Sequence, residues 1–318
     1  MNPLRWLVSR FKQDQPSIYA LDHAVLNLRL PPSMWMNMGY WEDASDLPTA
    51  CTALLDQVLI TAGLLDPTGL PTTRAPPRRL HLLDVGIGCG DQTLHLLQCH
   101  RPDAHRGPLF DTYTGITDLP AQADWARQRL PLTRRQTRVQ IHAANAADPA
   151  VWPAELKNAL LPRASSDSPA AEGAETWLLA LDSLYHFRPS RRPLLRYARA
   201  SLHASLMAFD LLRADHLSPW QSLLLRLVCW VSGTPFANLL TAAEYEALLV
   251  EVGYALPRVE MRDVSPHVFA GLAAFIRRQD AALRPFGLGV GRFRVAARLF
   301  DWWARTGIVR GVVVVARV

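Results

Sequence analysis

The chain has 318 residues, of which 49% are hydrophobic and 19% are charged. This composition excludes a disordered chain and provides enough apolar side chain for one large domain or two small ones. The formal net charge of +6 comes mostly from scattered arginines. Scattered charge favours solvated surface positions over a continuous nucleic-acid track and leaves a weak attraction to anionic membranes open.

The four cysteines show no metal-ligand spacing. They indicate a reduced, intracellular protein without a disulfide framework, and no metal site is expected. No apolar run reaches the length of a membrane span. The basic N-terminus faintly resembles a mitochondrial presequence, but a surface helix in a cytoplasmic protein is the favoured interpretation.

Two loop-like stretches, rich in proline, glycine and small polar residues, lie at 66–79 and 162–175. The first separates an N-terminal helical region, 1–65, from the rest of the chain. We expect residues 1–65 to form a cap that contributes to a substrate site, and 66–318 to form the main domain.

Between these loops, strands and helices alternate along the chain. Strands are expected at 80–85, 112–116, 139–143, 177–181, 206–209, 259–261 and 311–318. Helices are expected from about residue 92, at 120–129 and at 242–252, where Thr241 and Glu244 form a capping-box pattern. The alternation predicts an α/β sandwich with a mainly parallel sheet, whose ligand lies at the carboxyl ends of the strands.

The first strand runs into a loop with glycine at every second position: Gly86, Gly88 and Gly90. Such glycines accept backbone angles forbidden to other residues, and the following helix directs free N–H groups to the same place. The spacing differs from that of dinucleotide binders, and Asp84 would repel a pyrophosphate but suits an ammonium group. A dinucleotide-dependent oxidoreductase is therefore disfavoured, and a glycine-rich turn without a ligand is the plainer alternative.

This loop resembles motif I of the S-adenosylmethionine-dependent methyltransferases. Over about residues 34–265 the chain is similar to the branch that contains the cyclopropane-fatty-acid synthases and the tocopherol and sterol methyltransferases. The resemblance implies a Rossmann-like methyltransferase fold: a three-layer α/β/α sandwich with a seven-stranded, mainly parallel sheet, N-terminal helices and a helical lid insertion at about 212–242. It also implies S-adenosyl-L-methionine as the cofactor.

The resemblance extends to the residues that follow the second and third strands. The ribose would be held by Thr117 or by the adjacent Asp118, and the sequence leaves this choice open. Asn145 would face the adenine unless it is a polar turn residue. Tyr40, in an N-x-G-Y-W-like segment, either packs over the cofactor or anchors the N-terminal helices. The implied cofactor-binding residues are Asp84, Gly86, Gly88, Gly90, Gln92, Ile116, Thr117, Gln122, Asn145, Ala146 and Tyr40.

The segment that ends the fourth strand carries the candidate catalytic residues Asp182, Tyr185 and His186. A neutral imidazole suits proton removal, so His186 is the first candidate for a general base, with Tyr185 in reserve. Asp182 would orient the imidazole or contact the amino group of the cofactor. The alternative for His186 is a packed core residue.

Two apolar stretches, 220–240 and 293–303, suggest a lid that forms a greasy pocket or faces a membrane; ordinary core is favoured for the second. The segment from Asp182 to Tyr185 lacks the prolines with which amino-directed nucleic-acid methyltransferases grip a flipped base. We therefore expect a methyltransferase that acts on a small, hydrophobic or lipid-like acceptor, without nucleic acid and with possible peripheral membrane contact. The alternatives are a non-catalytic scaffold and an RNA or protein methyltransferase.

Overall fold

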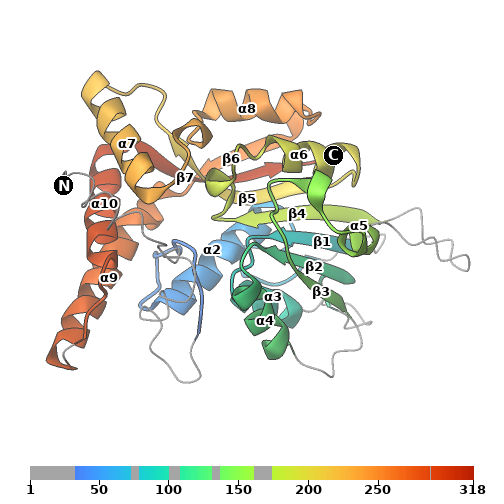
Figure 1. Cartoon of the computed structure of the whole chain (residues 1–318), viewed down its shortest axis with the longest axis horizontal. Coiled ribbons are helices and arrows are strands. Elements are labelled where there is room, and N and C mark those ends of the chain that lie inside the picture. The colour runs from blue at the N-terminus through green and yellow to red at the C-terminus, as the bar shows by residue number, and fades with distance from the viewer. Residues whose placement is uncertain (1–32, 73–78, 100–107, 131–136, 161–173, 287) are drawn as a thin grey trace, which may run out of the picture.

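A seven-stranded sheet forms the centre of the computed structural model, which describes residues 33–72, 79–99, 108–130, 137–160, 174–286 and 288–318 (Figure 1). The strand order is β3-β2-β1-β4-β5-β7-β6. Strand β7 is antiparallel to β5 and β6, and all other neighbours are parallel. The predicted seven-stranded, mainly parallel sheet is confirmed. The strands are β1 (Leu80–Val85), β2 (Thr112–Thr117), β3 (Arg138–Ala143), β4 (Glu175–Leu181), β5 (Ser205–Arg213), β6 (Val259–Asp263) and β7 (Val309–Ala316).

Helices cover both faces of the sheet and complete a three-layer sandwich (Figure 1). One buried cluster joins the sheet to α2, α3, α4, α9 and α10, and the other joins it to α5, α6 and α8. The helices are α2 (Leu47–Thr61), α3 (Asp91–Gln98), α4 (Pro120–Arg129), α5 (Ala154–Leu160), α6 (Arg192–Ala200), α7 (Pro219–Ser232), α8 (Ala242–Glu251), α9 (Phe269–Leu283) and α10 (Phe293–Thr306).

The strands follow the expected ranges within a few residues, apart from β5. We expected this strand to end at Phe209, but it continues to Arg213. In the structure Asp210 is fully buried inside the strand, where Arg191 and Tyr245 hydrogen bond to it. A paired acid does not interrupt a buried strand.

The capping signals in the sequence fix the start of two helices. Thr241 and Glu244 form the expected capping box at the start of α8, and Ser218 and Gln221 form another at the start of α7. Helix α7 lies within the stretch 212–242 that we expected to be a lid. Residues 1–32 of the predicted cap and parts of the two predicted loops lie outside the described residues, and the domain boundary near residue 65 stays a prediction.

The segment before α2 is fastened to α9 by direct backbone packing. The Trp41 amide donates a hydrogen bond of 2.6 Å to the His267 carbonyl, and its ring stacks on Phe275 at a centroid distance of 5.2 Å. A Cβ added at Gly271 would lie 2.1 Å from the Trp41 Cβ. Only glycine therefore allows this approach.

Replacing Gly271 tests this contact, because two effects of opposite sign compete. Alanine favours a helix over glycine by up to about 1 kcal/mol, but overpacking costs about 1–3 kcal/mol. We expect Gly271→Ala to lower the free energy of unfolding measured by urea denaturation. The reverse exchange at the exposed neighbour, Ala270→Gly, controls for helix propensity alone. A more stable Gly271→Ala variant would contradict the packing.

Candidate active site

The three glycines after β1 have different neighbours. All three have positive φ angles, of 81°, 54° and 86°. A Cβ at Gly86 would lie 2.7 Å from Ser183, and one at Gly90 would lie 2.8 Å from Ala126. At Gly88 nothing lies within 4 Å. The outer glycines thus allow close packing of the protein on itself, and the middle one faces open space that a ligand can fill.

Asp84, near the carboxyl end of β1, connects the strand before the glycine-rich loop to neighbouring elements. It is fully buried, and its two carboxyl oxygens accept hydrogen bonds from Gln92 (2.7 Å) and from the Tyr113 hydroxyl (2.6 Å). Burial raises the pKa of Asp84 to about 7, although these two hydrogen bonds act in the opposite direction. The carboxyl group therefore links β1, β2 and α3. Tyr113 was not predicted as part of the site, because it lies 29 positions from Asp84 in the chain.

A second acid, Asp91, fastens the other end of the loop. Arg129, at the end of α4, donates to both of its carboxylate oxygens at 2.6 and 2.9 Å and to the Cys89 carbonyl at 3.1 Å. The Met34 amide also donates to Asp91, at 3.1 Å. This clamp holds the loop between α4 and the segment before α2. The clamp was not predicted, because Arg129, Asp91 and Met34 are far apart in the chain.

The residues after β2 divide into an engaged pair and an exposed acid. The Thr117 hydroxyl donates to Gln122 at 2.7 Å, and both side chains are buried. Asp118 is exposed at the end of the strand. The Ile116 carbonyl accepts hydrogen bonds from the Gly86 and Ile87 amides. Of the two predicted ribose ligands, Asp118 is the one whose side chain is accessible.

The predicted adenine contact is an exposed turn residue in the structure. The side-chain oxygen of Asn145 accepts a hydrogen bond from the Ala147 amide at 2.9 Å, and its carbonyl accepts one from Trp152 at 2.8 Å. Ala146 is buried beside it. Asn145 is therefore accessible at the carboxyl end of β3.

Tyr40 packs against the region that precedes α9. Its hydroxyl donates to Glu42 at 3.0 Å, and its ring lies 4.7 Å from that of His267. Both roles that the sequence left open for Tyr40, anchoring of the N-terminal helices and a cofactor contact, stay predictions.

The three candidate catalytic residues separate into two groups. The Tyr185 hydroxyl donates to Asp182 at 2.8 Å, whereas the His186 Nδ1 atom lies 3.5 Å from the Thr234 hydroxyl. Burial, with a smaller contribution from Arg188, lowers the pKa of His186 to about 4. Asp182 thus pairs with Tyr185, and His186 turns toward the segment after α7. An orienting role of Asp182 toward His186 stays a prediction.

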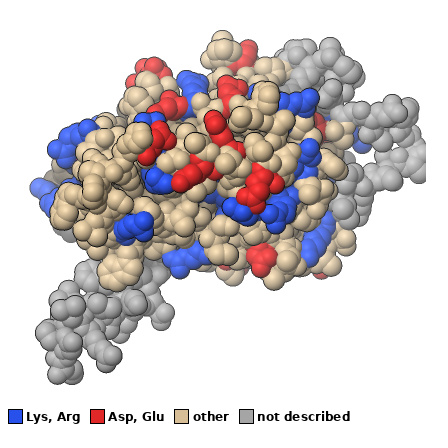
Figure 2. Space-filling model, turned by 90° about the horizontal axis from the view of Figure 1, so that it is seen from above, with Lys and Arg blue, Asp and Glu red and all other residues tan. Residues whose placement is uncertain are grey.

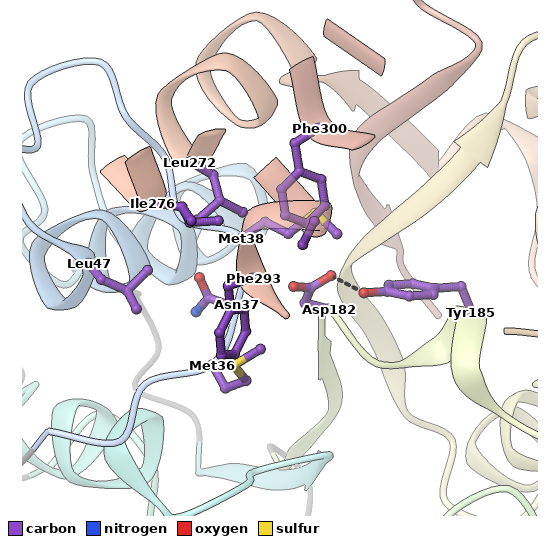
Figure 3. A pocket seen from close by; sticks show the side chains of 11 residues that line it. Met36, Asn37, Met38, Leu47, Asp182, Tyr185, Leu272, Ile276, Phe293 and Phe300 are labelled. Atoms are coloured by element: carbon purple, nitrogen blue, oxygen red, sulfur yellow. Dashed lines mark hydrogen bonds between the residues drawn. The ribbon is translucent and has the colours of Figure 1, made fainter. Parts of the chain in front are cut away.

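Asp182 lies at the polar end of an apolar pocket (Figure 3). The pocket encloses about 470 Å³ including its open mouth. Figure 3 shows Tyr185 on one side of the Asp182 carboxylate and the side chains of α9 and α10 on the other. Burial raises the pKa of Asp182 to about 7, against the opposing effect of hydrogen bonds from Tyr185 and the Met38 backbone. The other lining residues are Met36, Asn37, Met38, Leu47, Leu272, Ile276, Phe293, Ala296 and Phe300.

A buried ion pair supports the Tyr185 loop from behind. Arg191 is 1% exposed and contacts both the Asp210 carboxylate and the Asn238 carbonyl. The Asn238 side chain in turn donates to the Tyr185 carbonyl at 3.3 Å. The position of Tyr185 therefore depends on α6, β5 and the turn after α7. Sequence spacing contains no signal for this pairing.

No group of three or more His, Cys, Asp or Glu side chains that could hold a metal ion occurs within the described part of the chain.

The structure is similar in fold to known proteins whose sequence identity to this chain is low. No protein-family model and no curated protein matches the sequence. Among solved structures, the cyclopropane synthase MmaA2 from Mycobacterium tuberculosis is similar with a TM-score of 0.61, at 16% identity over 96% of this chain and 98% of that one. Geranyl diphosphate C-methyltransferase from Streptomyces coelicolor has a TM-score of 0.53, at 15% identity over 99% and 98% of the two chains.

The [4+2]-cyclase SpnF is also similar, with a TM-score of 0.56, at 16% identity over 94% of this chain and 93% of that one. The chain therefore has the fold of these enzymes, which includes the expected three-layer α/β/α architecture. Because one fold hosts methyl transfer and cyclisation alike, the function must be argued from the site.

The raised pKa of Asp84 has a consequence for stability. An unfolded aspartate has a pKa of about 3.9, so between about pH 4 and 7 the folded state holds a proton that the unfolded state has lost. This contribution is fully present below pH 4 and is lost as the pH rises through 7. We expect Asp84→Asn to remove this pH dependence. Between about pH 4 and 7, the free energy of unfolding should therefore fall more steeply with pH in the wild type than in the variant, by at most about 1.4 kcal/mol per pH unit.

Urea denaturation at several pH values measures this difference, and the exposed acid Asp118, changed to asparagine, is the matched control. Parallel pH profiles for the wild type and Asp84→Asn would show that the Asp84 carboxyl group titrates normally.

Proposed function

We propose that the chain is an S-adenosylmethionine-dependent methyltransferase that acts on a small, lipid-like acceptor. The observation that carries the proposal is the arrangement at the carboxyl ends of β1 and β4. The open space at Gly88 follows one strand, and the apolar pocket with Asp182 follows the other. Ligands of open α/β sheets bind at this edge, near the point where the strand order reverses.

The loop fits the proposed cofactor. Gly88 leaves room for backbone approach, and the first turn of α3 directs free N–H groups toward that side. Gly86, Gly90, Asp84 and Gln92 shape this cradle. The similar geranyl diphosphate C-methyltransferase was crystallised with S-adenosyl-L-homocysteine, which agrees with this assignment. Further residues proposed to hold the cofactor are Ile116, Gln122, Asn145, Ala146 and Tyr40, with Asp118 favoured over Thr117 for the ribose because Thr117 already bonds Gln122.

The pocket sets the class of acceptor. Methionine, leucine, isoleucine and phenylalanine side chains dominate its wall, and no lysine or arginine is among the described residues that line it. Such a wall excludes water and favours an apolar group over a phosphate or another strongly charged headgroup. A lipid or isoprenoid-like hydrocarbon fits this chemistry.

When bound, the cofactor supplies an electrophilic methyl group on a sulfonium, a good leaving group. The protein must align the acceptor and take up any proton that it loses. Asp182 is suited to the second task because a carboxylate with a pKa of about 7 is half ionised at neutral pH. The Tyr185 hydroxyl, at 2.8 Å, holds the ionised form and fixes its direction. His186, with a pKa of about 4, is a weaker base and serves packing.

A non-catalytic scaffold is the second candidate function. The engagement of Thr117 with Gln122 and of Asn145 with Ala147 favours it, because both side chains are predicted to contact the cofactor but bond within the protein. Cofactor affinity separates the two candidates.

Titration with S-adenosylhomocysteine by calorimetry is the direct test. We expect the wild type to bind and Gly88→Arg to weaken binding by at least about a hundredfold, because the arginine fills the space above the loop. Gly69→Arg is the matched control, since Gly69 also has a positive φ and open surroundings but lies outside the site. Absence of binding to the wild type, or equal loss in both variants, would overturn the proposal.

The assignment of the base predicts a difference between neighbouring residues. With the best acceptor from a panel of unsaturated fatty acids and isoprenoid alcohols, we expect Asp182→Asn to lower kcat by about 10²–10⁴. Tyr185→Phe should lower kcat by about tenfold and shift the rising limb of the pH profile upward, because its hydrogen bond lowers the pKa of Asp182. His186→Ala should change kcat by less than about threefold.

The measurement is turnover against pH for all four proteins, with S-adenosylhomocysteine affinity as the control for an intact cofactor site. A loss with His186→Ala that matches the loss with Asp182→Asn would return the role of general base to His186.

A further inference from the structure

Helix α7 exposes a continuous apolar face to solvent. Leu225 and Cys229 are buried on one side of the helix. On the opposite side, the helical spacing aligns five side chains that are each more than half exposed. These residues, called the α7 face below, are Trp220 (70%), Leu223 (57%), Leu227 (53%), Trp230 (66%) and Val231 (69%).

Exposed apolar groups of this size at regular spacing mark an interaction site, whereas single exposed hydrophobic residues are common. No helix in the described part of the chain is long and apolar enough to cross a membrane.

The charges around the α7 face fit an anionic partner. Pro219–Ser232 contains no acidic residue, and its one charged side chain, Arg226, stacks over the Phe236 ring at 4.1 Å. Arg188 contacts the Gly233 carbonyl at the end of the helix. The whole chain carries a net charge of +6. In Figure 2 the end of the molecule where α7 lies is mostly tan with blue at its margins, and red side chains gather toward the middle.

The shape of the α7 face favours a bilayer over a protein partner. It is one convex helical stripe of about 21 Å, with a tryptophan near each end and leucines between them. Tryptophan rings prefer the interface between headgroups and acyl chains, and a helix lying in that plane needs no complementary surface. A stable dimer needs about 800 Å² on each partner with close shape complementarity, which one isolated helix does not offer.

The α7 face is also linked to the pocket. Beyond Gly233 the chain passes Thr234, which contacts His186, and Asn238, which holds the Tyr185 carbonyl. Figure 1 places α7 and the pocket-lining helix α10 at the same end of the molecule, and α10 exposes Val295 (68%) and Arg298 there.

From these observations we propose that α7 lies flat on an anionic lipid surface and inserts Trp220, Leu223, Leu227, Trp230 and Val231 at the headgroup boundary. The membrane contact itself is independent of the proposed methyl transfer. Delivery of a lipid acceptor from that surface into the pocket rests on the proposed function.

Sedimentation with vesicles tests the proposal on the full chain. We expect the wild type to bind phosphatidylcholine vesicles that contain phosphatidylglycerol, and to bind pure phosphatidylcholine vesicles more weakly. The triple variant Leu223→Gln/Leu227→Gln/Trp230→Gln should lose about a hundredfold in partitioning, without a change in melting temperature because these side chains are exposed.

The matched control is Val151→Gln/Val250→Gln/Leu256→Gln, which changes exposed apolar residues (69%, 49% and 50%) outside α7. Binding of the control like the wild type supports the proposal. Equal binding of both triple variants, or no binding of the wild type to either vesicle, overturns it. Equal binding to both vesicle types overturns the anionic preference.

Light scattering tests whether a second copy of the chain, rather than a membrane, binds the α7 face. A wild-type dimer that the α7 substitutions convert to a monomer would assign the face to a second copy and overturn the proposal. S-Adenosylhomocysteine calorimetry on the same proteins keeps the two proposals distinguishable: vesicle binding without cofactor binding refutes only the proposed function, and the reverse result refutes only the membrane contact.

Discussion

Buried or half-buried carboxyl groups on, or directly after, three neighbouring strands are the constraint around which this part of the sheet is organised. Asp84 lies on β1, Asp182 follows β4 and Asp210 lies on β5, and burial raises the pKa of each. Each carboxyl group needs hydrogen-bond donors, because an unpaired buried charge costs several kcal/mol. The donors come from different parts of the chain, so satisfying the three acids also connects the elements that form the site.

The hydrogen-bond partner of Asp182 depends on the backbone conformation at the end of β4. Asp182 has a φ of 59°, in the left-handed region that aspartate tolerates, and this turn directs the chain into a short 3₁₀ helix, Leu184–His186. Tyr185 lies in this short helix, and its hydroxyl donates to the Asp182 carboxylate at 2.8 Å. The three candidate catalytic residues were predicted in this segment, but a hydrogen bond between Asp182 and Tyr185 was not predicted.

Periodicity and capping predicted the parts of the fold that depend on nearby residues. The apolar run at 177–181 and the valines at 312–315 specify strands because a strand buried on both faces needs continuous apolar side chains. The pairing of Asp210 with Arg191, and of Asp91 with Arg129, depends on the tertiary arrangement. Sequence spacing contains no signal for such contacts, so the length of β5 and the loop clamp could not be predicted.

The apolar character of the pocket and the raised pKa of Asp182 have the same cause, which is the exclusion of water by the surrounding side chains. Met36 and Met38 come from the segment before α2, and Phe293 and Phe300 come from α10, so residues more than 250 positions apart make one apolar wall beside Asp182. This wall removes water from the carboxylate, which raises its pKa to about 7. The same exclusion of water favours the binding of a hydrocarbon group in the pocket. The apolar acceptor and the role of Asp182 as a base, both proposed above, would therefore be two consequences of a single packing arrangement, and the close approach of Trp41 to Gly271 is one contact between the two segments that form the wall.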